Sequence, residues 1–559
     1  RKNKNFDIEN ISYEDEKVFQ LLSSGHTVGL FQIESAGMRE ALIQMKPNHI
    51  EDIIALVALY RPGPMNNIPI YNDCKHGKQK PDYLHPLLEE ILKPTYGVII
   101  YQEQVMQIAQ KLSGFTAGQA DLLRRAMGKK KRAELEKQKQ SFISGAVKNG
   151  ISKDVAAGIF LKIEPFAEYG FNKSHAAAYA IISYQTAYLK TYFPKEFIAA
   201  SMTMDISNQN KLSEFYEELK RLKIEVERPN INKCFADFRN DEKKFYYALG
   251  GIKAVGYEAI SNIVKERINN GKFKSVNDFL NRINPKDINK LQLEGLVKGG
   301  AFDCLIDNRQ TLYNSIPNFI TKSKNIYENK SANQIDLFGS NDDENDDFIT
   351  LIKDWNFEER LSKEFEAVGF FISDHPLNQF KEIFNDYNIV DYQKFNAESD
   401  IKDTNIAATL LKVQERKTSK GNAYAILKLT DSSSVFELFI FSEVLESNRN
   451  ILKEGNSLIL TVNKSLSDEN NRFKRINVKR IVSLKELLNK PIKNITFNLN
   501  STKDLDEISK FLITPGETKI NIKISDNDRV LDFNLQNGRK IDRKSINLIR
   551  NKDISAVIS

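Results

Sequence analysis

The hydrophobic pattern of this chain changes its period once, near residue 405. Before that point the apolar stretches read as helices that end at breaks such as Arg61-Pro62-Gly63-Pro64 and Asn149-Gly150. After it, apolar and polar residues alternate, as in half-buried strands. This alternation predicts strands at 405–415, 423–430, 434–441, 456–463 and 473–482. The 559 residues are therefore expected to form several domains, mainly helical at first and β-rich later.

The five predicted strands have a short helix, 442–449, between the third and the fourth, which is the layout of an OB-fold β-barrel. The first turn is basic and carries Arg416, Lys417 and Lys420. Such loops meet single-stranded nucleic acid in many OB modules. The strands show no obvious aromatic platform, so a structural or protein-binding OB domain is the alternative. From Pro491 onward, further strands and helices predict a small α+β docking domain without a chemical motif.

Composition and charge exclude several classes of protein. The net charge is only +7, so basic residues matter where they cluster. The three cysteines, Cys74, Cys234 and Cys304, are far apart, which argues against a disulfide framework or zinc site and fits a reducing compartment. The sequence contains neither a run of 18 apolar residues nor a signal peptide, so we expect a cytoplasmic protein. The first residue is Arg1, as expected for part of a longer protein.

A basic block lies at residues 121–132. Arg124 and Arg125 follow an apolar helical stretch, and Lys129, Lys130, Lys131 and Arg132 follow a glycine. The planar fork of arginine suits bidentate contact with phosphate oxygens, and lysines follow a polyanion as point charges. The alternative interpretation is a solvated helix face.

A second candidate anion site begins an alanine- and tyrosine-rich helix. Asn172, Lys173, Ser174 and His175 lie at its start, where free N–H groups and the helix dipole favour an anion. In the alternative interpretation Ser174 is only an N-cap and His175 a core histidine. Arg61 either points into a cleft or lies exposed in a loop.

A glycine hairpin precedes another predicted helix at Gly251-Ile252-Lys253-Ala254-Val255-Gly256. Its backbone N–H groups are suited to hold one DNA phosphate, with Gly251, Lys253 and Gly256 as the candidates, and it resembles a helix-hairpin-helix element. The alternative is a glycine turn between packed helices. A second helical pair follows and ends at Leu293–Leu305.

Residues 322–350 are polar, with five acidic residues between Asp342 and Asp347, and are expected to form a disordered loop. Gln334-Ile335-Asp336-Leu337-Phe338 is a hydrophobic island within them. Because Leu337 and Phe338 would have no core to enter, a pocket on a partner is the expected place for them.

Taken in order, these motifs resemble one known family. The sequence reads GLFQIES, IALVALYRPGP, PTYGVIIYQEQVMQIAQ, LLRRAMGKKK, YGFNKSHAAAYA, GIKAVG, LVKGGAFD and QIDLF. Together these closely resemble the C-terminal part of the bacterial DNA polymerase III alpha subunit family (C-family replicative polymerases), and the match covers nearly the whole chain. The resemblance implies a polymerase fingers region at 1–230, helix-hairpin-helix elements at 231–321, a loop with a clamp-binding motif at 322–350, a connecting segment at 351–400, an OB fold at 401–483 and a docking domain at 484–559.

The resemblance also implies roles for residues. The incoming dNTP would be bound by Arg124, Arg125, Ser174, His175 and Lys129, with Asn172, Lys173 and Arg61 as further candidates. DNA would be bound by Lys130, Lys131, Gly251, Lys253, Gly256, Arg416, Lys417 and Lys420. The sliding clamp would be bound by Gln334, Asp336, Leu337 and Phe338.

The same resemblance implies that two Mg²⁺ ions are held by palm aspartates upstream of this sequence, so no metal ligand is expected in the chain and the isolated fragment is expected to be inactive. Expected partners are primed duplex DNA, single-stranded template, dNTP, the beta sliding clamp, the clamp-loader tau subunit and a proofreading exonuclease subunit, without a membrane. The alternative is a non-catalytic adaptor that binds DNA and the clamp.

Overall fold

The computed structural model describes residues 6–128, 132–331, 346, 349–398, 400–418, 421–466, 474–526, 529–552 and 554–558. The chain divides into two compact units. The first contains residues 1–205, 222–224 and 239–245, and the second contains 206–221, 225–238 and 246–559. No helix among the described residues is both long and apolar enough to cross a membrane.

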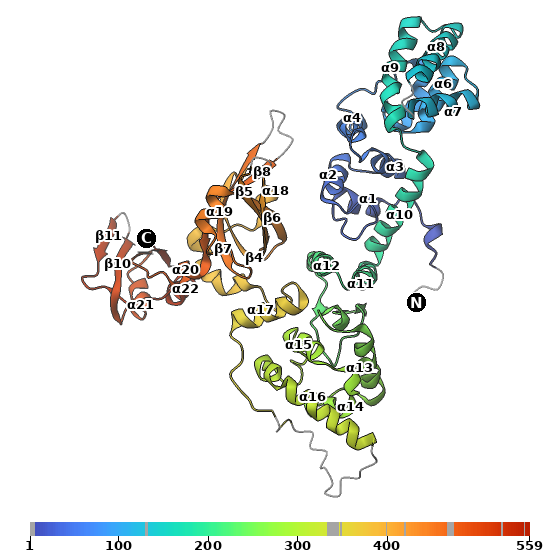
Figure 1. Cartoon of the computed structure of the whole chain (residues 1–559). Coiled ribbons are helices and arrows are strands. Elements are labelled where there is room, and N and C mark those ends of the chain that lie inside the picture. The colour runs from blue at the N-terminus through green and yellow to red at the C-terminus, as the bar shows by residue number, and fades with distance from the viewer. Residues whose placement is uncertain are drawn as a thin grey trace. The chain divides into compact units, whose positions relative to one another are not determined.

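The first unit is built from helices, coloured blue to cyan in Figure 1. They are α1 Glu16–Ser23, α2 Ala36–Met45, α3 Ile50–Leu59, α4 Ile68–Lys75, α5 Glu89–Leu92, α6 Gln102–Ser113, α7 Ala117–Gly128, α8 Arg132–Lys148, α9 Lys153–Tyr169, α10 Lys173–Tyr192 and α11 Pro194–Met204. Short 3₁₀ helices lie at Ile8–Asn10, Pro64–Asn67, Pro86–Leu88 and Lys93–Thr95.

Two hydrophobic cores hold this unit together. One is formed by α1 to α4 with α10 and contains Leu56 and Tyr184, and the other is formed by α5 to α9 and contains Ile108 and Phe142. The helix α6 ends at Gly114, whose left-handed φ of 65° favours glycine. The cores position α6, α7 and the start of α10, which carry the candidate site.

The second unit begins with a helical part. Its helices are α12 Gln209–Arg221, α13 Tyr257–Asn270, α14 Val276–Arg282, α15 Lys290–Lys298, α16 Arg309–Ser331, α17 Phe357–Val368 and α18 Tyr392–Ala397. Two-residue strands (β1 Val226–Glu227, β2 Arg239–Asn240, β3 Phe245–Tyr246) and 3₁₀ helices (Leu249–Gly251, Pro285–Asp287, Pro376–Ile383, Asn385–Tyr387) complete the described segments between 206 and 400.

The loop is expected at residues 322–350, and its predicted first residue is wrong because α16 continues to Ser331. Ile316, Phe319 and Ser323 lie on one helical face and are buried, so packing carries the helix past residue 322. The clamp-motif candidates Gln334, Asp336, Leu337 and Phe338 lie outside the described residues.

A five-stranded antiparallel sheet follows the helices. Its strands are β4 Asp403–Lys417, β5 Ala423–Thr430, β6 Val435–Phe441, β7 Ser457–Leu466 and β8 Lys474–Ser483, with α19 Ser442–Asn448 after the third. All five predicted strands and the helix between them are confirmed. The order is β6-β5-β4-β7-β8, and no hydrogen-bonded pairing joins β6 to β8 among the described residues, so the sheet is open. The chain is thus a helical region followed by a β-rich one.

The last part of the chain is a four-stranded sheet with helices. It contains α20 Leu484–Asn489, β9 Asn494–Leu499, α21 Asp504–Ser509, β10 Pro515–Asp526, β11 Arg529–Asn534, α22 Arg543–Arg550 and β12 Ser555–Ile558. The order is β11-β10-β9-β12, with β9 parallel to β10. At the start of α21 the Asp504 side chain accepts from the N–H groups of Asn500 and Ser501, and Ser501 Oγ accepts from Lys503 N–H.

Candidate nucleotide and DNA interface

The start of α6 lies beside the turn that precedes α10. Phe171 N–H donates to the Ile100 carbonyl at 3.1 Å, and Gln102 N–H donates to the Phe171 carbonyl at 3.0 Å. An isolated parallel β-bridge joins Tyr101 and Phe171. This bridge brings residues 101–103 next to 171–173, although about 70 residues separate them in the chain.

Arg124 and Arg125 are held on α7 by one carboxylate. Asp121 accepts from Arg124 Nη2 at 2.7 Å and from Arg125 Nε at 2.7 Å, and the two arginine side chains are 30% and 62% exposed. The bond from Arg124 is the main cause that holds the pKa of Asp121 below its ordinary value. Arg124 Nη1 also donates to Gln102 Oε1 at 3.3 Å. The two guanidinium groups are therefore oriented, yet still open to solvent.

The amino end of α10 is capped by Asn172. Its Oδ1 accepts from His175 N–H at 2.8 Å, and its Nδ2 donates to Glu103 Oε1 at 2.9 Å. Both Glu103 oxygens accept from Lys173 N–H, at 3.1 and 3.0 Å. The interpretation of Ser174 as the N-cap is therefore wrong, since Ser174 is the second helical residue. Ser174 is exposed, and its N–H and hydroxyl have no hydrogen-bond partner among the described residues.

His175 is an exposed residue and not a core histidine, so that alternative is also wrong. Its ring centroid lies 5.4 Å from that of Phe171 and 4.6 Å from that of Tyr179. Tilted contacts with two aromatic rings, at interplanar angles of 54° and 42°, orient the imidazole of this exposed residue. The ring thus belongs to the residue that directly follows Ser174 in the first turn of α10.

Arg61 joins the same neighbourhood through Phe171. Its guanidinium carbon lies 4.4 Å from the Phe171 ring centroid, and its Nε donates to the Ala58 carbonyl at 3.0 Å. Partial burial lowers the pKa of Arg61. The side chain is therefore anchored by a cation–π contact instead of extending from a loop. Lys173 Nζ lies 5.4 Å from the Tyr101 ring and 3.5 Å from Glu51 Oε2.

The structure thus connects Arg124, Asn172, Lys173, His175 and Arg61 through three intermediaries, Gln102, Glu103 and Phe171. Sequence reasoning missed these three because each acts through a contact with a distant part of the chain. Lys129, Lys130 and Lys131 lie outside the described residues.

The first hairpin of the second unit, residues 251–256, has only part of its backbone exposed to solvent. Gly251 is buried and donates its N–H to the Ala248 carbonyl at 3.0 Å, and Lys253 N–H donates to the Ala367 carbonyl at 2.9 Å. Ala254, at φ 63°, and Gly256 are exposed. Gly256 is the N-cap of α13 and supplies no side-chain cap, and no side chain among the described residues is seen to accept from the first-turn N–H groups of α13.

The second hairpin, between α15 and α16, is closed by the chain itself. Asn308 Oδ1 accepts from Thr311 N–H at 2.9 Å, and Asp354 Oδ1 accepts from Gln310 N–H at 2.9 Å. Arg309 Nη1 donates back to the Lys298 carbonyl at 3.0 Å. Of the two hairpins, the first is therefore the one with free backbone donors.

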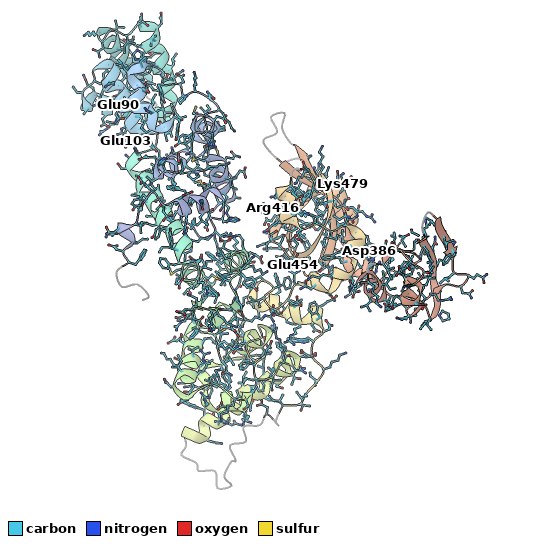
Figure 2. All side chains as sticks on the ribbon, turned by 180° about the vertical axis from the view of Figure 1, so that it is seen from behind. Glu90, Glu103, Asp386, Arg416, Glu454 and Lys479 are labelled. Atoms are coloured by element: carbon cyan, nitrogen blue, oxygen red, sulfur yellow. The ribbon has the colours of Figure 1, made fainter. Side chains whose placement is uncertain are left out.

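The outer face of the five-stranded sheet carries an aromatic platform that the sequence interpretation overlooked. Arg416 pairs with Tyr424, and Tyr424 pairs with Phe441, so the three side chains form one cross-strand row. Phe439 follows on the same face of β6, and Phe439 and Phe441 are 48% and 43% exposed. Arg416, labelled in Figure 2, is exposed at the end of this face, and the exposed Lys417 follows it on the opposite face of β4. Lys420 lies outside the described residues.

Known proteins resemble this chain along most of its length. Residues 1–150 match the model described as the bacterial DNA polymerase III alpha subunit finger domain, and residues 223–312 match a helix-hairpin-helix motif. Curated proteins named DNA polymerase III subunit alpha are 41% identical over 84% of the chain in Caulobacter vibrioides, 38% over 95% in Borreliella burgdorferi and 42% over 83% in Rickettsia bellii. The chain belongs to the bacterial DNA polymerase III alpha subunit family.

Within this family the chain is partial in length. It spans 41%, 47% and 42% of the three relatives. The finger match contains Arg124 and Arg125, and the helix-hairpin-helix match contains both hairpins. No group of three or more His, Cys, Asp or Glu side chains in the described part of the chain could hold a metal ion.

Proposed function

We propose that this chain forms the nucleotide-positioning and DNA-binding part of a DNA-directed DNA polymerase, a nucleotidyltransferase that adds dNTPs to a primer 3′-hydroxyl during chromosomal replication. The observation that carries the proposal is the Arg124–Arg125 pair, oriented by Asp121 and Gln102 beside the start of α10. The name shared by the relatives supports the replicative role.

The chain's own residues contribute to this reaction by orienting the triphosphate. Arg124 and Arg125 donate to phosphate oxygens in a fork geometry, and Lys129 adds charge. The N–H and hydroxyl of Ser174 and the imidazole of His175 add donors at the amino end of α10. Asn172, Lys173 and Arg61, whose polar groups are held by Glu103, Glu51 and Ala58, keep this end in place. Because these charged groups are oriented before the reaction, the protein needs little further rearrangement to stabilise the charge of the transition state.

Template-directed extension tests the function directly. A complete polymerase that contains this chain should extend a primed template with the four dNTPs in the order that the template specifies. Extension that ignores the template, or none by a folded complete protein, would contradict the proposal.

DNA binding is divided between two surfaces in this proposal. The open first turn of α13, with Lys253 and the exposed Gly256 hairpin, holds a phosphate of duplex DNA without reading its sequence. The five-stranded sheet is an OB fold, supported by its strand order and by the helix after the third strand, and it binds single-stranded template. Phe439 and Phe441 stack on bases, while Arg416, Lys417 and Lys420 contact the backbone.

The partners and domain boundaries complete the proposal. Gln334, Asp336, Leu337 and Phe338 bind the sliding clamp, residues 484–559 dock the tau subunit, and a proofreading exonuclease subunit joins the assembly in the cytoplasm. The proposed boundaries are 1–230, 231–331, 332–350, 351–400, 401–483 and 484–559, with the second moved to the end of α16. A peptide spanning residues 331–340 should bind the clamp, and Phe338→Ala should weaken it at least about tenfold. A peptide that does not bind at micromolar clamp would contradict the clamp assignment.

A further inference from the structure

Glu103 links two elements of the candidate nucleotide site. Its carboxylate accepts three hydrogen bonds from the turn before α10: two from Lys173 N–H, at 3.1 and 3.0 Å, and one from Asn172 Nδ2 at 2.9 Å. Asn172 in turn holds His175 N–H at 2.8 Å. One carboxylate therefore fixes the first turn of α10, on which Ser174 and His175 lie.

The neighbouring residue holds the other half of the site. Gln102 accepts from Arg124 Nη1 at 3.3 Å, and its own N–H donates to the Phe171 carbonyl at 3.0 Å. Gln102 and Glu103 are the first two residues of α6, whose body is packed in the same core as α7. The first turn of α6 is consequently a brace with Arg124 on one side and the amino end of α10 on the other.

Glu103 also occupies the place where a helix dipole would hold an anion. Both of its oxygens lie at the N–H of Lys173, the first residue of α10. An incoming triphosphate is thereby kept from this N–H, and its accessible donors are Ser174, His175 and the α7 arginines. The carboxylate fixes both where α10 lies and which donors the nucleotide meets.

From these contacts we infer that Glu103 is a positioning residue for the nucleotide, which acts through Asn172, Lys173 and Arg124 without touching the reacting atoms. The inference rests on the proposed function. It adds a role to a residue that neither the charge pattern nor the motif reading singled out.

Glu90 supplies a matched control. Glu90 and Glu103 both line a cavity of about 610 Å³ beside α6, and Figure 2 labels both. Glu90 pairs only at the surface, 3.7 Å from Lys111, and its side chain is 86% exposed. Replacing it removes a carboxylate from the same cavity without changing a bond to α10.

The test compares four variants of the complete polymerase: Glu103→Ala, Glu103→Gln, Glu90→Gln and Arg124→Ala. Glu103→Ala should raise the KM for dNTP about tenfold, the size expected for lost charged hydrogen bonds, with a smaller change in kcat and unchanged affinity for primed DNA. Glu103→Gln has a side chain of the same shape and keeps an oxygen that can accept from Lys173 N–H. Its KM for dNTP should therefore stay close to that of the parent. Glu90→Gln should match the parent.

A second readout needs no catalysis. In the 559-residue chain, Glu103→Ala should speed hydrogen exchange at the amides of Lys173 and His175, whereas Glu90→Gln should leave both rates unchanged. Unchanged exchange, or an unchanged KM in Glu103→Ala while Arg124→Ala raises it, would overturn the role of Glu103. An unchanged KM in Arg124→Ala would instead overturn the nucleotide site itself, so the two failures are distinguishable.

Discussion

Arg309 Nη1 lies 3.3 Å from Glu364 Oε2, and their side chains are only 4% and 0% exposed. Glu364 Oε1 also accepts the N–H groups of Ile372 and Ser373, each at 2.8 Å. This buried pair fixes α17 against α16. The carbonyl of Ala367 on α17 in turn accepts the N–H of Lys253 in the first hairpin, residues 251–256. The hairpin is therefore supported by a charge pair far from it in sequence.

Removing one partner of this pair should be costly. Glu364→Ala leaves Arg309 with Asp303 and the Lys298 carbonyl and leaves the N–H groups of Ile372 and Ser373 without their acceptor, which should lower the free energy of unfolding by about 3–5 kcal/mol. Urea unfolding followed by the fluorescence of Trp355, the single tryptophan, reports on this region. Glu366→Gln, at a more exposed pair with Lys298, should cost less than about 1 kcal/mol. Equal losses in the two variants would contradict the account.

The stability of the second unit should depend on pH through His375. Burial lowers its pKa from 6.5 to about 4, with smaller effects from Lys220, Asp374 and Lys381, and its Nδ1 accepts the N–H of Leu377. Because the unfolded chain binds this proton at higher pH than the folded chain, the free energy of unfolding falls as pH drops from 6.5 to 4.

The matched variant is His375→Asn, whose Oδ1 can replace the Nδ1 acceptor without taking up a proton. Between pH 6.5 and pH 4, the free energy of unfolding of the parent should fall by roughly 1–3 kcal/mol more than that of this variant. Urea titrations at several pH values measure the difference. Parallel pH profiles would show that His375 titrates alike in both states.

The two hairpins should differ in DNA binding. Gly256→Asp places a carboxylate at the uncapped start of α13, and its added Cβ meets only the Nε2 end of the flexible Gln292 side chain, at 3.1 Å. The variant should keep its stability yet bind duplex DNA more weakly, because the carboxylate repels phosphate and takes the N–H donors. Lys253→Ala should reduce, by about one, the slope of the logarithm of DNA affinity against the logarithm of salt concentration. Fluorescence anisotropy at several salt concentrations measures both effects.

Asn308→Asp is the control at the second hairpin, where the chain already supplies the caps. Its duplex affinity should equal that of the parent. Equal weakening at both hairpins would mean that added negative charge, and not the open turn of α13, determines the result.

The aromatic platform should bind single strands. Phe439→Ala and Phe441→Ala should each weaken oligo(dT) binding by about 1–3 kcal/mol, the value of one base–aromatic stack. Tyr327→Ala, at a tyrosine that is 45% exposed on α16, is the control and should have no effect. Quenching titrations with single-stranded oligonucleotides measure the affinities. Parent-like affinity of both phenylalanine variants would assign the sheet to a structural or protein-binding role.

Local pattern predicted much of this fold, and distant contacts account for what it missed. Alternation placed the strand 423–430 at the same bounds as β5. The same rule, applied to Val435–Phe441, puts Phe439 and Phe441 outside and Leu438 inside, so the platform could have been found. By contrast, the bonds from Glu103 to residues 172 and 173 join segments about 70 residues apart, and nothing in either segment indicates its partner. The four-residue β12 was missed because its pairing with β9 is equally distant.

The central claim is that Arg124 and Arg125 bind the triphosphate, and dNTP kinetics of the complete polymerase with both replaced by Ala test it most directly. The side chains pair with Asp121 at the surface, so thermal unfolding should not change. Lys137→Ala/Lys139→Ala, on the solvated side of α8, is the control and should behave as the parent. The double arginine variant should show a KM raised at least about tenfold and a lower kcat, since each charged contact is worth about 1.5–3 kcal/mol. Unchanged dNTP kinetics in the folded double variant would contradict the account.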